Sequence, residues 1–183
     1  MAFVSRAGAK LEHALNTFAI NVADLTCADL GCSTGGFTDC LLQRGARRVY
    51  AVDTGYGVLD WKLRKDQRVV VMERTNAMHV ELPEPISLVT IDVAWTKQRY
   101  ILPAAQKLLS LRGQIVTLIK PHYEAQRSVL RNGLLPADQL SAVVASVSTE
   151  IRSLGFEIAG MVDSPIKGSG GNAEVLAWLI SAS

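Results

Sequence analysis

The sequence predicts an α/β fold in which a doubly wound, mostly parallel sheet of seven strands ends in an antiparallel strand. An apolar run at 25–30 passes into a glycine-rich turn and then into residues with helical spacing, and this strand–turn–helix unit opens nucleotide-binding folds. Further apolar runs alternate with helical patterns, as they do in parallel sheets. The runs at 156–162 and 173–180 have no helix between them, so we expect them to pair antiparallel.

Each expected element follows from a local pattern. Ser5 is a suitable N-cap residue, and apolar residues recur after it at helical spacing as far as Phe18. Gly45 and Gly113 are expected to end two of the helices, and the polar segment 122–135 is expected to be a loop, as is 164–171. In chain order, the patterns predict helices at 5–19, 36–44, 60–65, 97–110 and 140–154, and strands at 25–30, 48–53, 69–72, 88–92, 114–120, 156–162 and 173–180.

The glycine turn is the first candidate binding site. Three residues separate Gly31 from Gly35, a wider spacing than that of the dinucleotide fingerprint. It suits a cofactor without a pyrophosphate, and S-adenosyl-L-methionine is the candidate; a plain strand-to-helix turn is the alternative. Asp53 ends the second strand 24 residues after Asp29, where an acid holds ribose hydroxyls, although a lone acid there can also cap a helix. Together with polar residues after the third strand, which would face the adenine, the candidate cofactor-binding residues are Asp29, Gly31, Ser33, Thr34, Gly35, Gly36, Phe37, Asp53, Glu73, Asn76 and Asp92.

The carboxyl edge of the sheet is the expected place of the chemistry, because ligands of open α/β sheets bind there. Asp92 and Lys120 each end a parallel strand. Glu174 stands at the start of the antiparallel last strand, which lies at the same edge. The topology therefore predicts that these three residues converge, although each could instead cap a helix or reach solvent.

Composition sets limits on the class of protein. The chain has 183 residues, 49% hydrophobic and 20% charged residues and a net charge of +2, values typical of a globular domain, which we expect to span 1–183. No apolar run is long enough to span a membrane, and the N-terminus lacks a signal-peptide pattern, so a cytoplasmic location is expected. Three cysteines without zinc-type spacing predict neither a metal site nor a disulfide framework.

Basic residues are concentrated in one third of the chain. Such a cluster could contact phosphates, and a solvated face with mixed ion pairs is the alternative. The residues are Arg44, Arg47, Arg48, Lys62, Arg64, Lys65 and Arg68.

Several longer motifs, in a fixed order, carry a family resemblance. They are residues 4–11, 34–39, 51–57, 73–76, 118–124, 164–168 and 171–174. With these motifs the chain resembles the TlyA (haemolysin-A-like) branch of the FtsJ-like RNA methyltransferases, almost from end to end.

The resemblance implies a Rossmann-like fold, S-adenosylmethionine as the methyl donor, and 2′-O-methylation of ribose in ribosomal RNA. It also implies a catalytic Lys-Asp-Lys-Glu tetrad, which falls on Lys10, Asp92, Lys120 and Glu174; Lys10 comes from the resemblance alone. A ribose hydroxyl is a poor nucleophile and needs a proton acceptor and close alignment. Lys120 is the candidate base, or else it orients the hydroxyl and stabilises the developing negative charge.

The chain departs from the family pattern in two places. The family usually carries a small RNA-binding domain of the S4 type first, and this chain is expected to lack it, so RNA affinity must come from its own surface or from a partner. The family also tends to have Asp-Val-Ser-Phe-Ile-Ser-Leu where residues 92–98 stand here. Trp95 in this segment could stack on a base, but a core position is the favoured expectation.

Other functions stay open on the sequence. A methyltransferase acting on a non-ribosomal substrate would share the fold and cofactor. A catalytically silent RNA- or cofactor-binding protein is disfavoured by the intact tetrad. A membrane-lysing protein lacks a supporting apolar span, and a dinucleotide oxidoreductase lacks the right glycine spacing.

Overall fold

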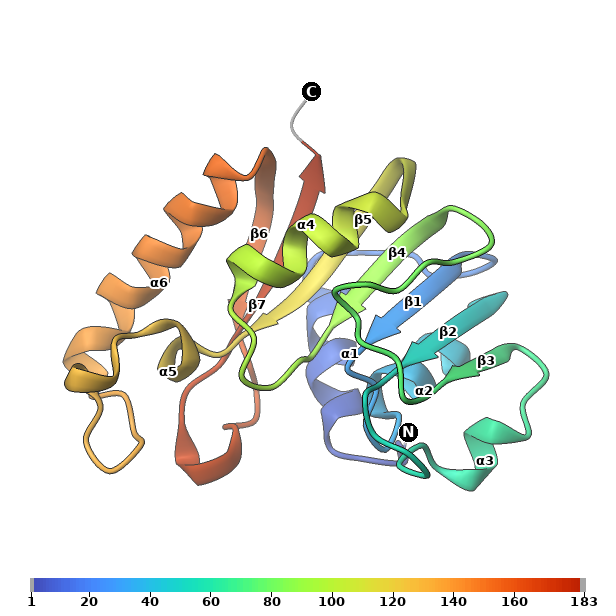
Figure 1. Cartoon of the computed structure of the whole chain (residues 1–183), viewed down its shortest axis with the longest axis horizontal. Coiled ribbons are helices and arrows are strands. Elements are labelled where there is room, and N and C mark those ends of the chain that lie inside the picture. Colours follow the sequence, from blue (N-terminus) through green and yellow to red (C-terminus); the bar gives the residue numbers. More distant parts are fainter. Residues whose placement is uncertain (1, 182–183) are drawn as a thin grey trace.

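The computed structural model describes residues 2–181, whose seven strands form one mixed sheet (Figure 1). The strands are β1 (Thr26–Leu30), β2 (Arg48–Val52), β3 (Val69–Met72), β4 (Ile86–Ile91), β5 (Leu109–Ile119), β6 (Phe156–Asp163) and β7 (Val175–Ser181). Their order in the sheet is β3-β2-β1-β4-β5-β7-β6. Strands β1 to β5 are parallel, whereas β7 runs antiparallel to both β5 and β6, which confirms the predicted topology.

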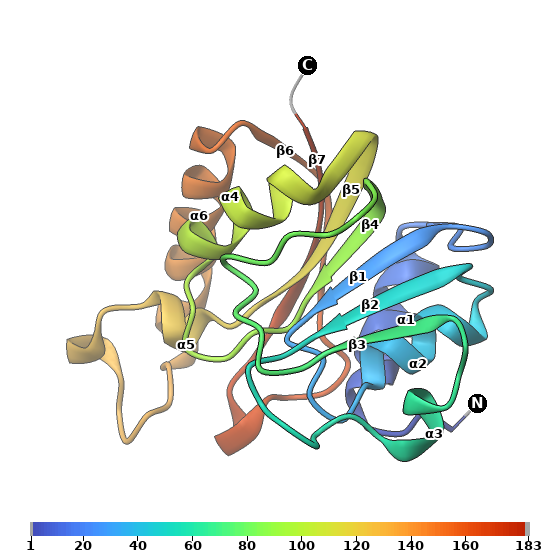
Figure 2. The same cartoon turned by 45° about the vertical axis from the view of Figure 1, so that its right-hand side comes forward.

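Helices cover both faces of this sheet. They are α1 (Ala7–Thr17), α2 (Gly36–Gln43), α3 (Trp61–Arg64), α4 (Gln98–Leu108), α5 (Pro121–Glu124) and α6 (Ala137–Ser153), with 3₁₀ turns η1 (Arg127–Val129) and η2 (Ser169–Gly171). Helices α1 and α2 lie together on one face and α4 and α6 on the other, as Figures 1 and 2 show. The chain turns back between β1 and β4, which places a topological switch point at the carboxyl ends of these two strands.

The central strands are buried on both sides. All five residues of β1 are buried, which explains why this strand reads as a continuous apolar run with a single acid. Its alternate side chains enter two different cores, because successive residues of a strand point to opposite faces. Cys27 packs in the core beneath α1 and α2, whereas Ala28 and Leu30 pack in the core beneath α4 and α6.

Three local expectations were wrong. Helix α1 begins at Ala7 with Arg6, not Ser5, at the N-cap position, and no side chain caps it. Gly113 does not separate a helix from a strand but lies inside β5, which begins at Leu109 because Leu109 pairs with Ile86 of β4 across an irregularity. The segment 122–135 contains most of α5 and all of η1 instead of being a plain loop.

The strand ends also differ slightly from expectation. β4 begins at Ile86, two residues before the predicted start, and β7 begins at Val175, two residues after it. Glu174 therefore stands just ahead of the last strand. Among residues 2–181, no helix is both long enough and apolar enough to cross a membrane.

Candidate active site

Two lysine–carboxylate pairs meet at the carboxyl edge of the sheet. Asp92 follows β4 and Lys120 follows β5, and the Lys120 Nζ lies 2.7 Å from the Asp92 Oδ1. The antiparallel direction of β7 brings Glu174 to this same edge. There its Oε2 lies 2.5 Å from the Nζ of Lys10, which α1 contributes from one face of the sheet. The predicted convergence of the three strand-end residues is therefore observed, and Lys10 joins them.

A cleft of about 350 Å³ opens over these pairs. Besides the four charged side chains, Arg6, Phe37 and Gly168 line it. Gly168 is required there, because a Cβ atom at this position would collide with the Glu174 carboxylate. The cleft thus offers three cations, Arg6, Lys10 and Lys120, and two anions to any group that enters.

A second cavity, of about 410 Å³, adjoins the first. Both are lined by Gly31, Ser33, Asp92 and Ala94, so the two form one continuous depression along the strand ends. The second cavity is also lined by the apolar residues Ala77, Met78, Val93 and Ile101 and by Asp53 and Asn76. Apolar side chains suit a purine ring, a strand-end acid suits ribose hydroxyls, and the turn after β1 suits an amino-acid moiety, so the lining fits S-adenosylmethionine.

The glycine turn brings these walls close together. Gly31 has a φ of +86°, and a Cβ atom there would lie 2.7 Å from the backbone oxygen of Asp92. Only glycine allows this approach of the β1 and β4 ends without strain. The Asp53 carboxylate accepts hydrogen bonds from the backbone N–H groups of Ser33, at 2.8 Å, and Gly55, at 2.7 Å. Asp53 therefore fixes the turn as well as lining the cavity.

Asp29 lies beneath the cavities instead of lining them. Its side chain is fully buried and accepts hydrogen bonds from the Thr38 hydroxyl at 2.7 Å and the Thr90 hydroxyl at 3.2 Å. Burial raises the pKa of Asp29 to about 7, a rise that these hydrogen bonds oppose. Asp29 thus joins β1 to α2 and β4 and lines neither cavity.

Three further cofactor candidates, Gly35, Gly36 and Glu73, also line neither cavity. A Cβ atom on Gly35 would collide with the Leu63 side chain, and one on Gly36 would collide with Ser5, so both glycines permit close packing. The Glu73 carboxylate accepts hydrogen bonds from the N–H groups of Gly57 and Val58 and pairs with Arg64. Glu73 lines neither cavity, and its hydrogen bonds order the loop before α3. Thr34 and Phe37 line the first cleft, and their binding of the cofactor stays a prediction.

Trp95 is an exposed residue, which corrects the expectation of a core position. Its side chain is 81% exposed, and its φ is +63°, uncommon for an aromatic residue. The ring packs against Tyr123 with centroids 4.8 Å apart, and Lys120 Nζ lies 5.9 Å from the Tyr123 centroid. Trp95 thus lines the second cavity, and its partner Tyr123 lies beside Lys120.

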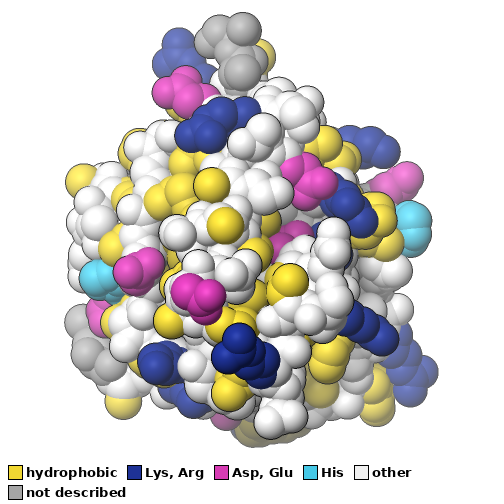
Figure 3. Space-filling model, turned by 90° about the vertical axis from the view of Figure 1, so that its left-hand side faces the viewer, with side chains coloured by type: hydrophobic (Ala, Val, Ile, Leu, Met, Phe, Trp, Pro, Cys, Tyr) yellow, Lys and Arg dark blue, Asp and Glu magenta, His cyan; other side chains and the backbone are white. Residues whose placement is uncertain are grey.

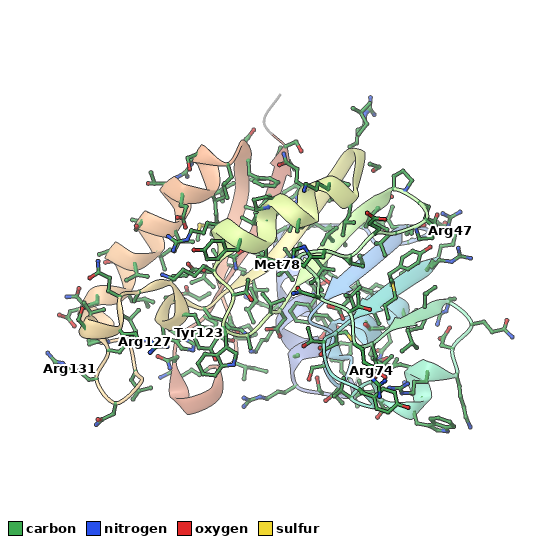
Figure 4. The ribbon with its side chains drawn as sticks, viewed as in Figure 1. Arg47, Arg74, Met78, Tyr123, Arg127 and Arg131 are labelled. Atoms are coloured by element: carbon green, nitrogen blue, oxygen red, sulfur yellow. The ribbon has the colours of Figure 1, made fainter. Side chains whose placement is uncertain are left out.

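The basic cluster at 44–68 is largely neutralised by acids. Arg47 and Arg48 both pair with Glu84, and Arg68 pairs with Asp66. Arg47 extends from the amino end of β2, far from Tyr123, Arg127 and Arg131 at the carboxyl edge (Figure 4). These ion pairs favour the interpretation of the cluster as a face of mixed charges. On the opposite side of the molecule, around α6, basic and acidic side chains are likewise scattered among uncharged ones (Figure 3).

Two lining residues were missed by sequence reasoning. Arg6 precedes Lys10 by four residues, one helical turn, and this spacing could have placed both on one side of α1. Gly168 belongs to the motif at 164–168, but only the structure shows that a Cβ atom at this position would collide with the Glu174 carboxylate.

Comparisons with known proteins agree with this arrangement. The FtsJ-like methyltransferase family model matches residues 3–180. The chain is 44% identical over 184 residues to the 16S/23S rRNA (cytidine-2′-O)-methyltransferase TlyA of Mycobacterium tuberculosis, covering 97% of this chain and 68% of that protein. It is 42% identical to Hemolysin A of Brachyspira hyodysenteriae, with 97% and 77% covered. A solved hemolysin-like structure from Streptococcus thermophilus superposes with a TM-score of 0.96 at 42% identity, covering all of this chain and 68% of that one.

The similarity extends over nearly the whole chain but over only part of its relatives. The chain covers 65% of protein YqxC of Bacillus subtilis, at 43% identity, so it spans about two thirds of the length of these curated relatives. More distant solved methyltransferases, such as the N-methyltransferase NodS of Bradyrhizobium japonicum at 14% identity and a TM-score of 0.63, share the fold. The chain belongs to the FtsJ-like methyltransferases, within the branch that contains TlyA and hemolysin A.

Proposed function

We propose that this protein transfers a methyl group from S-adenosylmethionine to the 2′-hydroxyl of a ribose in ribosomal RNA. The observation that carries the proposal is the position of the two lysine–carboxylate pairs directly beside a cavity that fits the methyl donor. Asp92 lines both cavities, so it lies where donor and acceptor would meet.

In the proposed site, Asp53, Asn76 and the backbone of the turn at 31–34 would hold S-adenosylmethionine, which supplies an electrophilic methyl group when bound. The task left to the protein is to activate and align a hydroxyl group, which is a weak nucleophile at neutral pH.

Lys120 and Asp92 are the groups we assign to that task. Because the two form an ion pair with an N–O distance of 2.7 Å, Lys120 is suited to donate a hydrogen bond to the 2′-oxygen and to stabilise its developing negative charge. The Asp92 carboxylate then accepts the proton of the hydroxyl. This favours the charge-stabilising role of Lys120 over its role as the base.

Lys10 and Glu174 complete the proposed tetrad on the other side of the cleft. Their ion pair is more deeply buried, and its charges contribute to the electrostatic potential in which the hydroxyl reacts. The pair also holds this wall of the cleft in place. The exposed aromatic ring of Trp95 supports a nucleotide substrate, because unpaired bases stack on such rings.

The substrate class draws on the relatives. TlyA of Mycobacterium tuberculosis is named a 16S/23S rRNA (cytidine-2′-O)-methyltransferase, and the relative from Campylobacter jejuni, 31% identical, a 23S rRNA (cytidine-2′-O)-methyltransferase. We therefore propose cytidine in ribosomal RNA as the target and a ribosomal particle or its RNA as the partner.

The test is transfer of labelled methyl from S-adenosylmethionine to unmodified ribosomal subunits, to free ribosomal RNA and to a non-ribosomal RNA of similar length. The products are digested to nucleosides. Label on 2′-O-methylcytidine from either ribosomal substrate is the expected result. Label on a base, or equal label on the non-ribosomal RNA, would favour a different methyltransferase, and cofactor binding without any transfer would favour a silent binding protein.

A further inference from the structure

The two segments that carry Asp92 and Lys120 run side by side and are joined at three points. The first is the ion pair of Asp92 with Lys120, and the second is the ring contact of Trp95 with Tyr123. The third is a hydrogen bond at 2.8 Å from the backbone N–H of Gln98 to the Glu124 carboxylate. The third contact lies farthest from the chemistry, and the proposed function assigns it no role.

Glu124 joins two helices at this point. It is the last residue of α5, a single turn that begins directly after Lys120. Its carboxylate caps α4, whose N-cap residue, Lys97, provides no side-chain cap of its own. The Lys97 ammonium in turn donates to the backbone oxygen of Glu124 at 2.8 Å. The end of α5 is therefore held by its side chain and by its backbone.

Gln98 connects the same point to the sheet. Its side chain is buried, with the residue 2% exposed, and its Oε1 accepts a hydrogen bond at 2.8 Å from the buried Thr117 hydroxyl. Thr117 belongs to β5, three residues before Lys120. A closed ring of contacts thus runs from β5 through Gln98 and Glu124 to α5 and back to Lys120.

We propose that Glu124 is a positioning residue for the methyl transfer: by capping α4 it fixes α5, and thereby holds Lys120 against Asp92. The inference rests on the proposed function for its activity measurement. Lysine is a long, flexible side chain, and a displacement of about 1 Å at a reacting group can cost on the order of 100-fold in rate. A frame that fixes the backbone on both sides of Lys120 restricts that displacement.

Glu124 also lines a groove between α4, α5 and α6. Glu150 of α6 lines the same groove, where it pairs with Arg99 at 3.6 Å. It makes no contact of the ring described above. Glu150→Ala is therefore a matched control that removes an acid from the same groove while leaving the hydrogen bond between Gln98 and Glu124 in place.

The experiment compares Glu124→Ala, Glu124→Gln and Glu150→Ala with the wild type. Residue-resolved hydrogen exchange of the Gln98 amide reports the bond itself and needs no activity. Single-turnover methyl transfer to ribosomal RNA and the dissociation constant for S-adenosylmethionine report its consequence. In Glu124→Ala we expect Gln98 protection to fall at least tenfold and the transfer rate to fall at least tenfold, with cofactor affinity within twofold of wild type.

Glu124→Gln tests whether the hydrogen bond to Gln98, and not the charge of Glu124, supports the reaction. Glutamine keeps an oxygen that can accept the same hydrogen bond, so Glu124→Gln should recover most of the protection and most of the rate, and Glu150→Ala should match the wild type. A wild-type rate in Glu124→Ala, or equal losses in Glu124→Ala and Glu150→Ala, would overturn the proposal. If the wild type methylates no RNA, the proposed function fails, and unchanged Gln98 exchange in Glu124→Ala would still overturn this inference separately.

Discussion

The two lysine–carboxylate pairs of the cleft differ in how far they are closed off from solvent. The side chains of Lys10 and Glu174 are 7% and 3% exposed, whereas those of Lys120 and Asp92 are 15% and 18% exposed. The first pair joins a helix to the start of β7, and the second joins the ends of two adjacent parallel strands.

The difference in exposure indicates that the two pairs have different functions. A closed pair is costly to break, because removal of one partner leaves a buried charge without compensation. An open pair can exchange its partner for a substrate group. We therefore assign the contact with the reacting hydroxyl to Lys120 and Asp92, and the shape and charge of the cleft wall to Lys10 and Glu174.

Removal of Lys120, the lysine of the more exposed pair, should have the largest effect, and it should change the rate of transfer without changing cofactor affinity or stability. Lys120→Ala is expected to slow single-turnover methyl transfer by roughly 100- to 1,000-fold, the range typical of losing one donor that stabilises developing negative charge. Cofactor affinity and unfolding free energy should stay near wild type. Lys107→Ala, at the end of α4 and away from the cleft, is the control. Transfer by Lys120→Ala at the rate of this control would remove Lys120 from the mechanism.

Removal of the closed carboxylate should act on stability as well. Glu174→Ala leaves the Lys10 ammonium buried and unpaired, and breaking a buried pair in this way costs about 3–5 kcal/mol. The measurement is the unfolding free energy from urea titration. Asp92→Ala, in the more open pair, should cost distinctly less. Equal costs for the two variants would contradict the assignment of closed and open pairs.

Asp29 extends the comparison because it is a buried carboxylate at the same edge that accepts hydrogen bonds from two threonine hydroxyls in place of a lysine. Its pKa is raised to about 7 in the folded protein, so the native state binds a proton that the unfolded chain releases. The resulting stability is present below about pH 4 and is lost as pH rises toward 7, by up to roughly 4 kcal/mol.

Asp29→Asn cannot ionise and should escape this loss. The unfolding free energy of Asp29→Asn minus that of wild type is therefore expected to increase between pH 4.5 and 7.5, as urea titrations at several pH values would show. Asp163→Asn, which replaces an exposed acid at the end of β6, is the control. A difference for Asp29→Asn that does not change with pH would mean that Asp29 is ionised in the folded protein.

The smallest expected effect lies at the mouth of the cleft. Trp95→Ala should weaken RNA binding by about 1–3 kcal/mol, the usual contribution of one base stacked on an aromatic ring. Because Trp95 is largely exposed, stability should hardly change, and Trp95→Phe should keep most of the affinity. Binding of ribosomal RNA, titrated at fixed salt, is the measurement. An RNA affinity of Trp95→Ala equal to that of the wild type would show that no base stacks on Trp95.

The fold and the outline of the site could be predicted from the sequence because they depend on local patterns. The apolar runs of β4 and β5 and the missing helix between β6 and β7 are sufficient to place Asp92, Lys120 and Glu174 at one edge. Lys10 could be placed only by family resemblance, because nothing local shows which residue of a helix faces a strand end.

The remaining assignments depend on contacts between distant segments. Asp29 and Glu73 look like cofactor ligands until the structure shows which hydroxyl and amide groups occupy their oxygens. Gly113 is a helix breaker by local pattern, but the pairing of β5 with β4 draws it into a strand. Trp95 is expected in the core because tryptophan is a large apolar residue, yet its side chain is 81% exposed.

The most direct test of the different functions of the two pairs is whether an added amine restores methyl transfer to the lysine variants. Single-turnover methyl transfer would be measured for Lys120→Ala and Lys10→Ala at increasing concentrations of ethylamine, with wild type as the reference. Because the open position can admit a small cation and the closed one cannot, the account predicts acceleration of Lys120→Ala and little change in Lys10→Ala. An equal response of the two variants, or a rate of Lys120→Ala that ethylamine leaves unchanged, would contradict it.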